Sequence, residues 1–244
     1  MITFQNVTLT YPDGARRITA LDNVSLAVPR GKVTAIIGAS GSGKSSLLAV
    51  GSTLTHPDKG IVLLDDEDIT NYSPSQAAQL RRDKIGIVFQ SANLIPSLTA
   101  LDQLAVMKEL NGSPGRSARK KAQVQAKEHL ESVGLGAAMN KRPHQLSGGQ
   151  RQRVAIARAL ALEPSVVICD EAVSALDVLV QAQILTLLND LQSAMGLSYL
   201  FITHDLAVVR QIADDVVVMQ SGKVVEHASV NQVFDSPREE YTRT

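Results

Sequence analysis

Two short segments, far apart in the chain, have the residue types and spacing of phosphate-binding sites. The first is Gly38-Ala-Ser-Gly-Ser-Gly-Lys-Ser45, which fits the pattern G-x-x-x-x-G-K-[ST]. The second is Leu146-Ser-Gly-Gly-Gln150, which comes before a run of helical periodicity and therefore places small residues at a helix N-terminus. One chain does not need two such cradles, so the second segment is predicted to serve a nucleotide bound by a neighbouring molecule.

The first segment lies between the apolar run Val33–Ile37 and a helix-like stretch that begins at Ser46. Strand, loop and helix in this order form the context in which the motif binds phosphate. Glycines adopt backbone conformations closed to other residues, so that successive N–H groups turn toward an anion at the positive end of a helix. Lys44 is expected to reach the β- and γ-phosphates, and the Ser45 hydroxyl to bind Mg²⁺. The nucleotide-binding residues assigned here are Gly38, Ser40, Gly41, Gly43, Lys44, Ser45 and Ser46.

The first motif, called the P-loop, occurs in many classes of protein. The second segment distinguishes among these classes. It is followed by Arg151–Leu160, in which apolar residues recur at helical spacing. Here the chain resembles the nucleotide-binding subunits of ATP-binding cassette (ABC) transporters, whose signature motif is this pentapeptide. In that family the signature of one subunit closes over ATP held by the P-loop of the other. The resemblance therefore implies a second ATPase subunit, taken as an identical copy, whose nucleotide is contacted by Ser147, Gly148, Gly149 and Gln150.

The remaining motifs follow in the order of that family. The apolar run Val166–Cys169 reads as a buried strand and ends in Asp170-Glu171, and ligands of α/β sheets bind at such strand ends. The resemblance implies that Asp170 holds Mg²⁺ and that Glu171 is the general base or polarises the attacking water. Ala172 stands where the family usually has Pro, and no loss of chemistry is expected because the position carries no charge or donor that the reaction needs.

Three further residues take their predicted roles from the resemblance. His204 follows the apolar run Tyr199–Ile202 and matches the switch histidine that contacts the γ-phosphate. Gln90 ends another apolar run and matches the glutamine that orients water or completes the Mg²⁺ shell. Tyr11 matches the aromatic residue that stacks on adenine, although the adjoining Pro-Asp-Gly also fits a simple turn.

Composition limits the classes of function. The chain has 244 residues, of which 44% are hydrophobic, enough for one large domain with a substantial core. Its 24 basic residues balance 24 acidic residues, so no nucleic-acid partner is expected.

Cys169 is the single cysteine and is expected to be a small buried hydrophobe, which fits a reducing compartment. No signal-like start and no apolar run near the ~18 residues of a membrane span occurs. The resemblance then implies separate transmembrane permease subunits, with this chain peripheral on the cytoplasmic face of the cell membrane.

The elements that must position these residues indicate an α/β fold. We expect a P-loop NTPase core with a mixed or parallel sheet, an N-terminal antiparallel β subdomain and an inserted α-helical lobe. Residues 1–90 and 161–244 are assigned to the core and residues 91–160 to the lobe that carries the signature. The expected strands are 2–9, 24–28, 199–202 and 215–219, with a hairpin-like segment at 223–226. The expected helices are 74–82, 99–110, 117–133, 178–195 and 230–234, with a Gly/Pro loop at 112–115.

The loop after Gln90 places apolar residues outside any expected element. In the family this region lines the groove that receives a helix of the membrane subunit. Leu94, Ile95 and Leu98 are therefore predicted partner contacts, and the alternative is that they fill the lobe's own core.

The resemblance divides when the kind of transporter is considered. Segments such as Val88–Pro96 and Arg142–Gly149 look like the branch for haem efflux, macrolide efflux and lipoprotein release, whereas the chain from about Val166 looks like oligopeptide and nickel importer ATPases. A natural mosaic and an engineered join both explain this. Efflux is favoured because the helical lobe, the part that meets the membrane partner in this family, is the part that resembles the efflux branch. A soluble ABC ATPase is an alternative, while a P-loop GTPase is disfavoured because its Asn-Lys-x-Asp pattern is absent.

Overall fold

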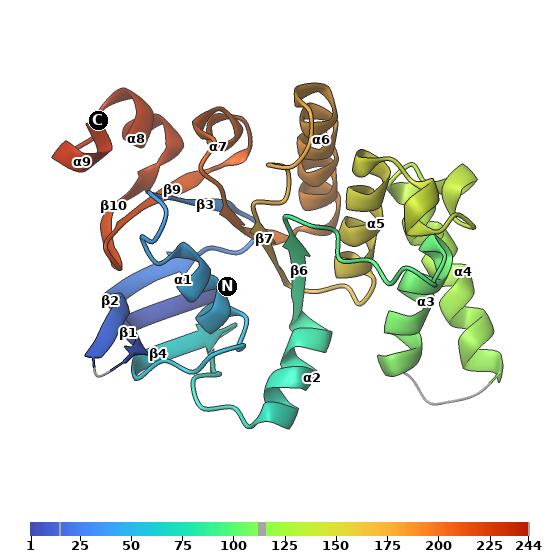
Figure 1. Cartoon of the computed structure of the whole chain (residues 1–244), viewed down its shortest axis with the longest axis horizontal. Helices are drawn as coiled ribbons and strands as arrows, with labels where there is room; N and C mark the ends of the chain where they lie inside the picture. The colour runs from blue at the N-terminus through green and yellow to red at the C-terminus, as the bar shows by residue number, and fades with distance from the viewer. Residues whose placement is uncertain (15, 112–115, 244) are drawn as a thin grey trace.

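The computed structural model describes residues 1–14, 16–111 and 116–243. Two sheets lie side by side, and a group of helices forms one end of the molecule (Figure 1). The smaller sheet has four strands and the larger has six. The predicted α/β class, with an antiparallel sheet beside a mostly parallel one, is confirmed.

The smaller sheet is antiparallel throughout. Its order is β2-β1-β4-β5, formed by β1 (Ile2–Asp13), β2 (Arg16–Val28), β4 (Lys59–Leu64) and β5 (Glu67–Asp68). Both strands expected near the N-terminus are present, and both are longer than expected. The extra residues Tyr11–Asp13 and Arg16–Thr19 pair with each other outside the core and are exposed. They lack the apolar alternation that marks a half-buried strand, so the pattern ends before the strand does.

The larger sheet brings the chemical residues together. Its order is β10-β9-β3-β8-β7-β6, and only β10 at the edge is antiparallel. Because parallel strands end at the same edge, the residues that follow β3, β6, β7 and β8 meet there. The strands are β3 (Val33–Ile37), β6 (Ile85–Phe89), β7 (Val166–Asp170), β8 (Ser198–Ile202), β9 (Asp215–Gln220) and β10 (Lys223–Ser229).

Local signals explain where several helices begin and end. Ser73 and Gln76 form a capping box at the start of α2, with Pro74 in its first turn. The Asp177 side chain accepts from the Val180 N–H at the start of α6, and Gly196 ends that helix in a left-handed conformation. The expected helices at 74–82, 178–195 and 230–234 are confirmed. The helices on the sheets are α1 (Lys44–Gly51), α2 (Pro74–Lys84), α6 (Val178–Met195), α7 (Leu206–Ile212), α8 (Val230–Asp235) and α9 (Glu240–Arg243).

The helical end of the molecule shares its core with the larger sheet. It contains α3 (Ala100–Asn111), α4 (Arg116–Ser132), α5 (Gly148–Leu160) and the short 3-10 turns η1 (Gly136–Ala138) and η2 (Pro143–Gln145). The expected helices at 99–110 and 117–133 are confirmed, and the expected loop at 112–115 lies outside the described residues. One hydrophobic core holds Leu104 of α3 and Leu130 of α4 together with Val167 and Tyr199 of the sheet. The lobe boundaries at 91 and 160 remain a prediction.

Within the described part of the chain, none of the helices has the length and apolar character needed to cross a bilayer. Cys169 is fully buried in β7, as expected of a small hydrophobe, and burial raises the pKa of its thiol to about 12.

Candidate active site

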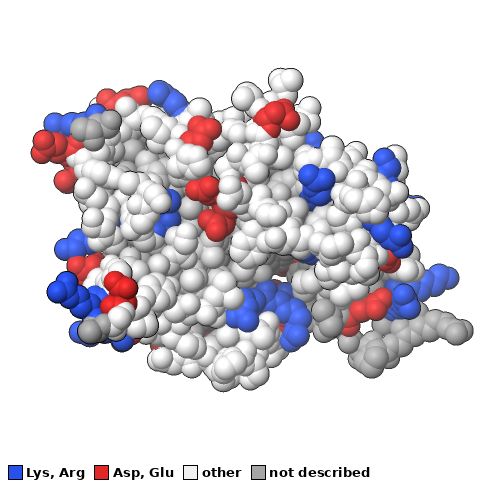
Figure 2. All heavy atoms as spheres, viewed as in Figure 1, with Lys and Arg blue, Asp and Glu red and all other residues white. Residues whose placement is uncertain are grey.

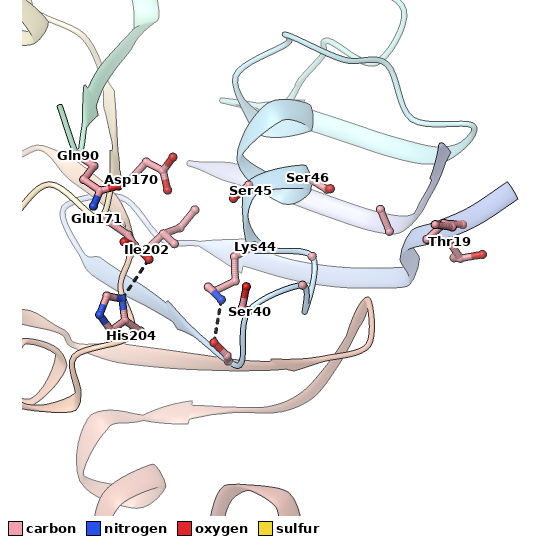
Figure 3. Close-up of a pocket in the computed structure, with 15 residues that line it drawn as sticks. Thr19, Ser40, Lys44, Ser45, Ser46, Gln90, Asp170, Glu171, Ile202 and His204 are labelled. Carbon is pink, nitrogen blue, oxygen red and sulfur yellow. Dashed lines mark hydrogen bonds and ion pairs between the residues drawn. The ribbon is translucent and has the colours of Figure 1, made fainter. Parts of the chain in front are cut away.

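A cavity of about 500 Å³ separates the P-loop from the carboxyl ends of β6, β7 and β8 (Figure 3). Most of the residues predicted for nucleotide, metal and catalysis lie around it. The strand β2 supplies an additional wall. The lining consists of Ile18, Thr19, Ala20, Gly38, Ser40, Gly41, Gly43, Lys44, Ser45, Ser46, Gln90, Asp170, Glu171, Ile202 and His204.

The P-loop turns back on itself at glycines that no other residue can replace without strain. Gly43 precedes α1 with φ +104°, and a Cβ on it would lie 2.5 Å from Ala20 O. The Lys44 ammonium folds into the loop and donates to Gly38 O at 2.7 Å and Ala39 O at 2.9 Å. These carbonyls satisfy the ammonium within the loop, so an incoming phosphate has to compete for it. Burial lowers the Lys44 pKa, an effect opposed by the charges of Glu171 and Asp170.

Carboxylate and imidazole groups face the P-loop across the cavity. Glu171 follows β7 with φ +49°, an uncommon conformation for a residue other than glycine. Its N–H donates to Ile202 O at 2.9 Å, and its carbonyl accepts from the Ser174 N–H at 3.1 Å. The Glu171 carboxylate lies 3.1 Å from His204 Nδ1 (Figure 3). The backbone therefore holds the carboxylate toward the cavity and beside the His204 imidazole.

Oxygen donors suited to Mg²⁺ lie around the same cavity. The Ser45 hydroxyl, the Gln90 amide and the Asp170 carboxylate all line it. Hard oxygen ligands of this kind are those that Mg²⁺ prefers, usually with waters in the remaining positions. The donor set therefore fits the metal predicted from the sequence. In the described residues no group of three or more His, Cys, Asp and Glu side chains forms a separate metal site.

The raised pKa of the Asp170 carboxyl predicts how the stability of the fold depends on pH. Burial and the like charge of Glu171 raise its pKa, partly offset by Lys44. A carboxyl whose pKa is higher in the folded state destabilises the fold at pH values above that pKa, and the penalty disappears below the unfolded pKa near 4. We expect Asp170→Asn to raise the thermal unfolding midpoint of the nucleotide-free protein at neutral pH, with the gain fading as the pH falls toward about 4. Melting curves across this range test it, and a gain that grows toward acid pH would contradict it.

The signature segment lies at a different place on the chain. Ser147 is exposed at the start of α5, where its hydroxyl accepts from the Gln150 N–H at 3.2 Å and its own N–H donates to the Gln150 side chain. Gly149 packs under α6, because a Cβ on it would meet Val180 Cγ1 at 2.5 Å. None of Ser147, Gly148, Gly149 and Gln150 lines the P-loop cavity. Their contact with a second molecule's nucleotide stays a prediction, and the exposure of Ser147 at a helix N-terminus is compatible with it.

Three other predicted positions need comment. Tyr11 does not line the cavity; it lies opposite Ile18 on the neighbouring strand, and Ile18 does line it. The adenine-stacking role of Tyr11 stays a prediction. In the loop after β6, Leu94 packs against the main core and Ile95 is exposed. The partner role is therefore better suited to Ile95, while Leu94 follows the alternative of a core residue.

Sequence reasoning missed the wall formed by Ile18, Thr19 and Ala20. No motif marks these residues, because they contribute through the place of β2 beside the P-loop. Ala20 O faces Gly43, and the Asp22 N–H donates to Gly222 O at 2.8 Å. These long-range contacts hold β2 in position, and they have no local signature in the sequence.

The fold and the cavity define a P-loop nucleoside triphosphatase: a phosphate-binding loop after the central strand faces an acidic pair at the end of the next strand but one. The profile of the ABC transporter family matches residues 21–174, more than half of the chain. The chain therefore belongs to the ABC transporter family, as the signature segment predicted, and it is an ATPase. It is similar to the methionine import ATP-binding protein MetN of Escherichia coli (strain K12), with 43% identity over 98% of this chain and 68% of the relative. MetN 1 of Yersinia pestis is 44% identical over the same shares.

Solved structures agree with this assignment. The dimeric ATP-binding cassette MJ0796, bound to ADP and Pi, is 36% identical with a TM-score of 0.84, covering 94% of this chain and 99% of that one. CbiO1 of Clostridium perfringens, part of an ABC transporter complex, is 32% identical with a TM-score of 0.85 over 96% of this chain and 90% of that one.

These relatives correct one expectation. The preference for an efflux motor is not supported, because both named MetN relatives are import proteins and match nearly the whole chain. The importer alternative is closer. The segments that suggested efflux, Val88–Pro96 and Arg142–Gly149, are short, whereas the match to the import relatives covers 98% of the chain. The match also runs through both halves of the chain and does not call for a join of two sources.

Proposed function

We propose that this chain is the ATP-hydrolysing motor of an ABC importer, peripheral on the cytoplasmic face of a membrane and bound to separate permease subunits. The observation that carries the proposal is that the residues predicted to contact nucleotide lie in two separate places on the chain. The P-loop, Asp170, Glu171 and His204 share one cavity, whereas the exposed Ser147 N-terminus of α5 lies outside it. Two copies in head-to-tail contact place the signature of each over the nucleotide of the other. The dimeric cassette related in fold supports this arrangement.

Each group of residues around the cavity has its own role in the proposed reaction. The P-loop N–H groups and Lys44 hold the ATP phosphates, and leaving its two carbonyl partners frees the ammonium for them. Glu171 accepts the proton of the attacking water, and His204, 3.1 Å away, positions that carboxylate and reports on the γ-phosphate. Ser45, Gln90 and Asp170 would hold Mg²⁺, which would supply positive charge beside the phosphates. Closing and reopening of the pair then drives the permease.

The transported substrate is proposed from the relatives. Both MetN relatives are named for methionine import, so methionine is the first substrate to test. Capture of the tagged chain from detergent-solubilised membranes should recover an integral membrane protein, and the pair in proteoliposomes should accumulate labelled methionine when ATP is supplied on the side of the motor. Recovery of the chain without any membrane protein would favour a soluble ABC ATPase instead.

If each nucleotide site is shared between two copies, two different inactive variants should restore activity to each other when they are mixed. Lys44→Ala and Ser147→Arg each inactivate both sites of a homodimer, the first by removing a phosphate ligand and the second by placing a bulky side chain at the signature. In a mixed dimer the defects fall in the same site and leave the other intact. We expect ATPase activity to appear when the two inactive variants are mixed. The measurement is phosphate release against mixing ratio, and a mixture as inactive as its components would contradict sites shared between copies.

A further inference from the structure

The loop that carries His204 is short and lies between the buried strand β8 and the helix α7. The imidazole itself is exposed, with 63% of its side chain open to solvent, so packing alone does not fix its direction. Its Nδ1 lies 3.1 Å from the Glu171 carboxylate (Figure 3). The place of His204 beside that carboxylate therefore depends on how the backbone on either side of it is held.

The two neighbours of His204 hold that backbone in different ways. Thr203 is buried, and its N–H donates to Ile36 O of the central strand at 3.3 Å. The Thr203 hydroxyl accepts from the Asp205 N–H at 3.1 Å. On the other side of the loop, Asp205 Oδ1 accepts from the Ala207 N–H at 2.9 Å and so caps α7. One side of the loop is thus tied to the sheet and the other to α7.

The second carboxylate oxygen of Asp205 is bound from outside this loop. Gln181, in the first turn of α6, donates from Nε2 to Asp205 Oδ2 at 3.3 Å. Both side chains are half-buried, and α6 and α7 lie in contact (Figure 1). Because α7 has only seven residues, a bond to the 18-residue helix α6 fixes the start of α7 against a longer element.

The other end of the Glu171–His204 pair is held by the segment that leads into α6. The Glu171 carbonyl accepts from the Ser174 N–H at 3.1 Å and from the Ser174 hydroxyl at 3.0 Å, and α6 begins just after this turn. The chain from Glu171 through the first turn of α6, and back through Asp205 to His204, therefore forms a closed ring of contacts. Gln181 makes the bond that closes this ring on the side of α7.

Acidic side chains gather near this ring. Figure 2 shows Asp and Glu side chains in the middle of one face, where the end of β7 and α7 lie in Figure 1. Asp170 and Glu171 come from the end of β7, and Asp205 comes directly before α7. A half-buried carboxylate is costly unless hydrogen-bond donors surround it. The neutral amide of Gln181 supplies a donor to Asp205 without adding a charge to the site.

We propose that Gln181 is a positioning residue for ATP hydrolysis. It fixes the loop of His204 through Asp205 and so keeps the imidazole beside the Glu171 carboxylate. Gln181 does not line the nucleotide cavity, so it acts through Asp205 and not on the substrate. The inference rests on the roles proposed above for Glu171 and His204, and it adds the residue that keeps them together. Loss of the bond lets the loop shift, and a shift of about 1 Å in a reacting group slows a reaction by up to about a hundredfold.

Gln181→Met tests the inference, because methionine has nearly the length of glutamine, suits a helix and donates no hydrogen bond. In phosphate release by the purified variant, kcat should fall about tenfold, while KM for ATP stays within about twofold of the wild type. A cooperative melting curve shows that the variant is folded. Gln181→Lys, whose ammonium also donates to Asp205, should restore most of the rate. Gln183→Met is the matched control, since Gln183 is exposed on the same helix, and it should have the wild-type rate.

A double-mutant cycle with His204→Ala separates positioning from a general loss of structure. If Gln181 acts through His204, adding Gln181→Met to His204→Ala should not lower the residual rate further, because the group that it positions is already gone. A change that damages the fold should lower the rate by the same factor in both backgrounds. Equal losses in the two backgrounds overturn the inference. A rate for Gln181→Lys as low as that for Gln181→Met also overturns it.

The same measurements separate the inference from the proposed function. If His204→Ala is inactive while Gln181→Met is as active as Gln183→Met, the inference fails and the proposed role of His204 stands. If His204→Ala hydrolyses ATP as fast as the wild type, the proposed role of His204 fails, and the inference fails with it. All of these rates are measured on the isolated protein, so none of the outcomes depends on the permease or on the transported substrate.

Discussion

Glu171→Gln should lower ATP turnover by at least about a hundredfold while leaving ATP binding intact. The substitution keeps the shape of the side chain and removes the carboxylate that we propose accepts a proton from water. Glu171 has no role in holding the P-loop, since Lys44 is bound by the loop carbonyls. The backbone bonds of residue 171 to Ile202 and Ser174 do not depend on the side chain. The nucleotide should therefore stay bound and unhydrolysed between two copies.

The measurement combines phosphate release with size-exclusion chromatography in the presence of ATP and Mg²⁺. The variant is expected to elute as a stable dimer, and the wild type as a monomer once its ATP is spent. Glu131→Gln is a control, because Glu131 is 53% exposed on α4 and pairs only with Lys127 among the described residues. It should hydrolyse ATP and elute as the wild type does. A Glu171→Gln protein that stays monomeric at every nucleotide concentration, beside an active wild type, would count against shared sites.

The sequence predicted which residues line one cavity where polar or charged side chains follow the ends of strands. The P-loop, Gln90, Asp170 and His204 each follow an apolar run, and runs buried on both faces are typical of parallel strands. Once the runs are taken as neighbours in a sheet, their carboxyl ends meet, and the residues after them share a cavity. The side-chain types then give the chemistry. This part of the prediction needs only local pattern and one rule of topology.

The parts that sequence reasoning missed depend on contacts between distant segments. The position of β2 beside the P-loop depends on its pairing with β1 and on the bond from Asp22 to Gly222. A smaller cavity of about 190 Å³, lined by Arg81, Arg82 and Arg158, depends on α5 lying close to β6, where a Cβ on Gly86 would come within 2.7 Å of Ala159 O. The preference for efflux was not supported for a different reason, because it relied on short segments, whereas the match to the import relatives covers nearly the whole chain.

Gly43→Ala should greatly lower the free energy of unfolding. The effect follows from the same close approach of β2 to the P-loop. A Cβ at this position would lie 2.5 Å from Ala20 O, 3.3 Å from Leu21 Cδ2 and 3.4 Å from Gly222 Cα. The nearest of these is backbone of a paired strand and cannot move aside as a flexible side chain does. Gly43 also has φ +104°, which alanine adopts only with strain. Overpacking and strain together should cost about 3–5 kcal/mol.

A second glycine separates strain from collision. Gly31 also has a positive φ, +65°, but nothing lies within 4 Å of the Cβ that alanine would add. Gly31→Ala should therefore cost only about 1–2 kcal/mol, the strain alone. For a domain of this size the unfolding midpoint should fall by roughly 10 °C or more for Gly43→Ala and by about 5 °C for Gly31→Ala.

Added Mg-ATP should raise the midpoint of Gly31→Ala as it does for the wild type, because ligand binding to the folded state stabilises it. It should leave the midpoint of Gly43→Ala unchanged, since the collision displaces the N–H groups and the lysine that we propose hold phosphate. Equal losses in the two variants would mean that β2 does not press on the loop, and that Ile18, Thr19 and Ala20 do not form a fixed wall of the site.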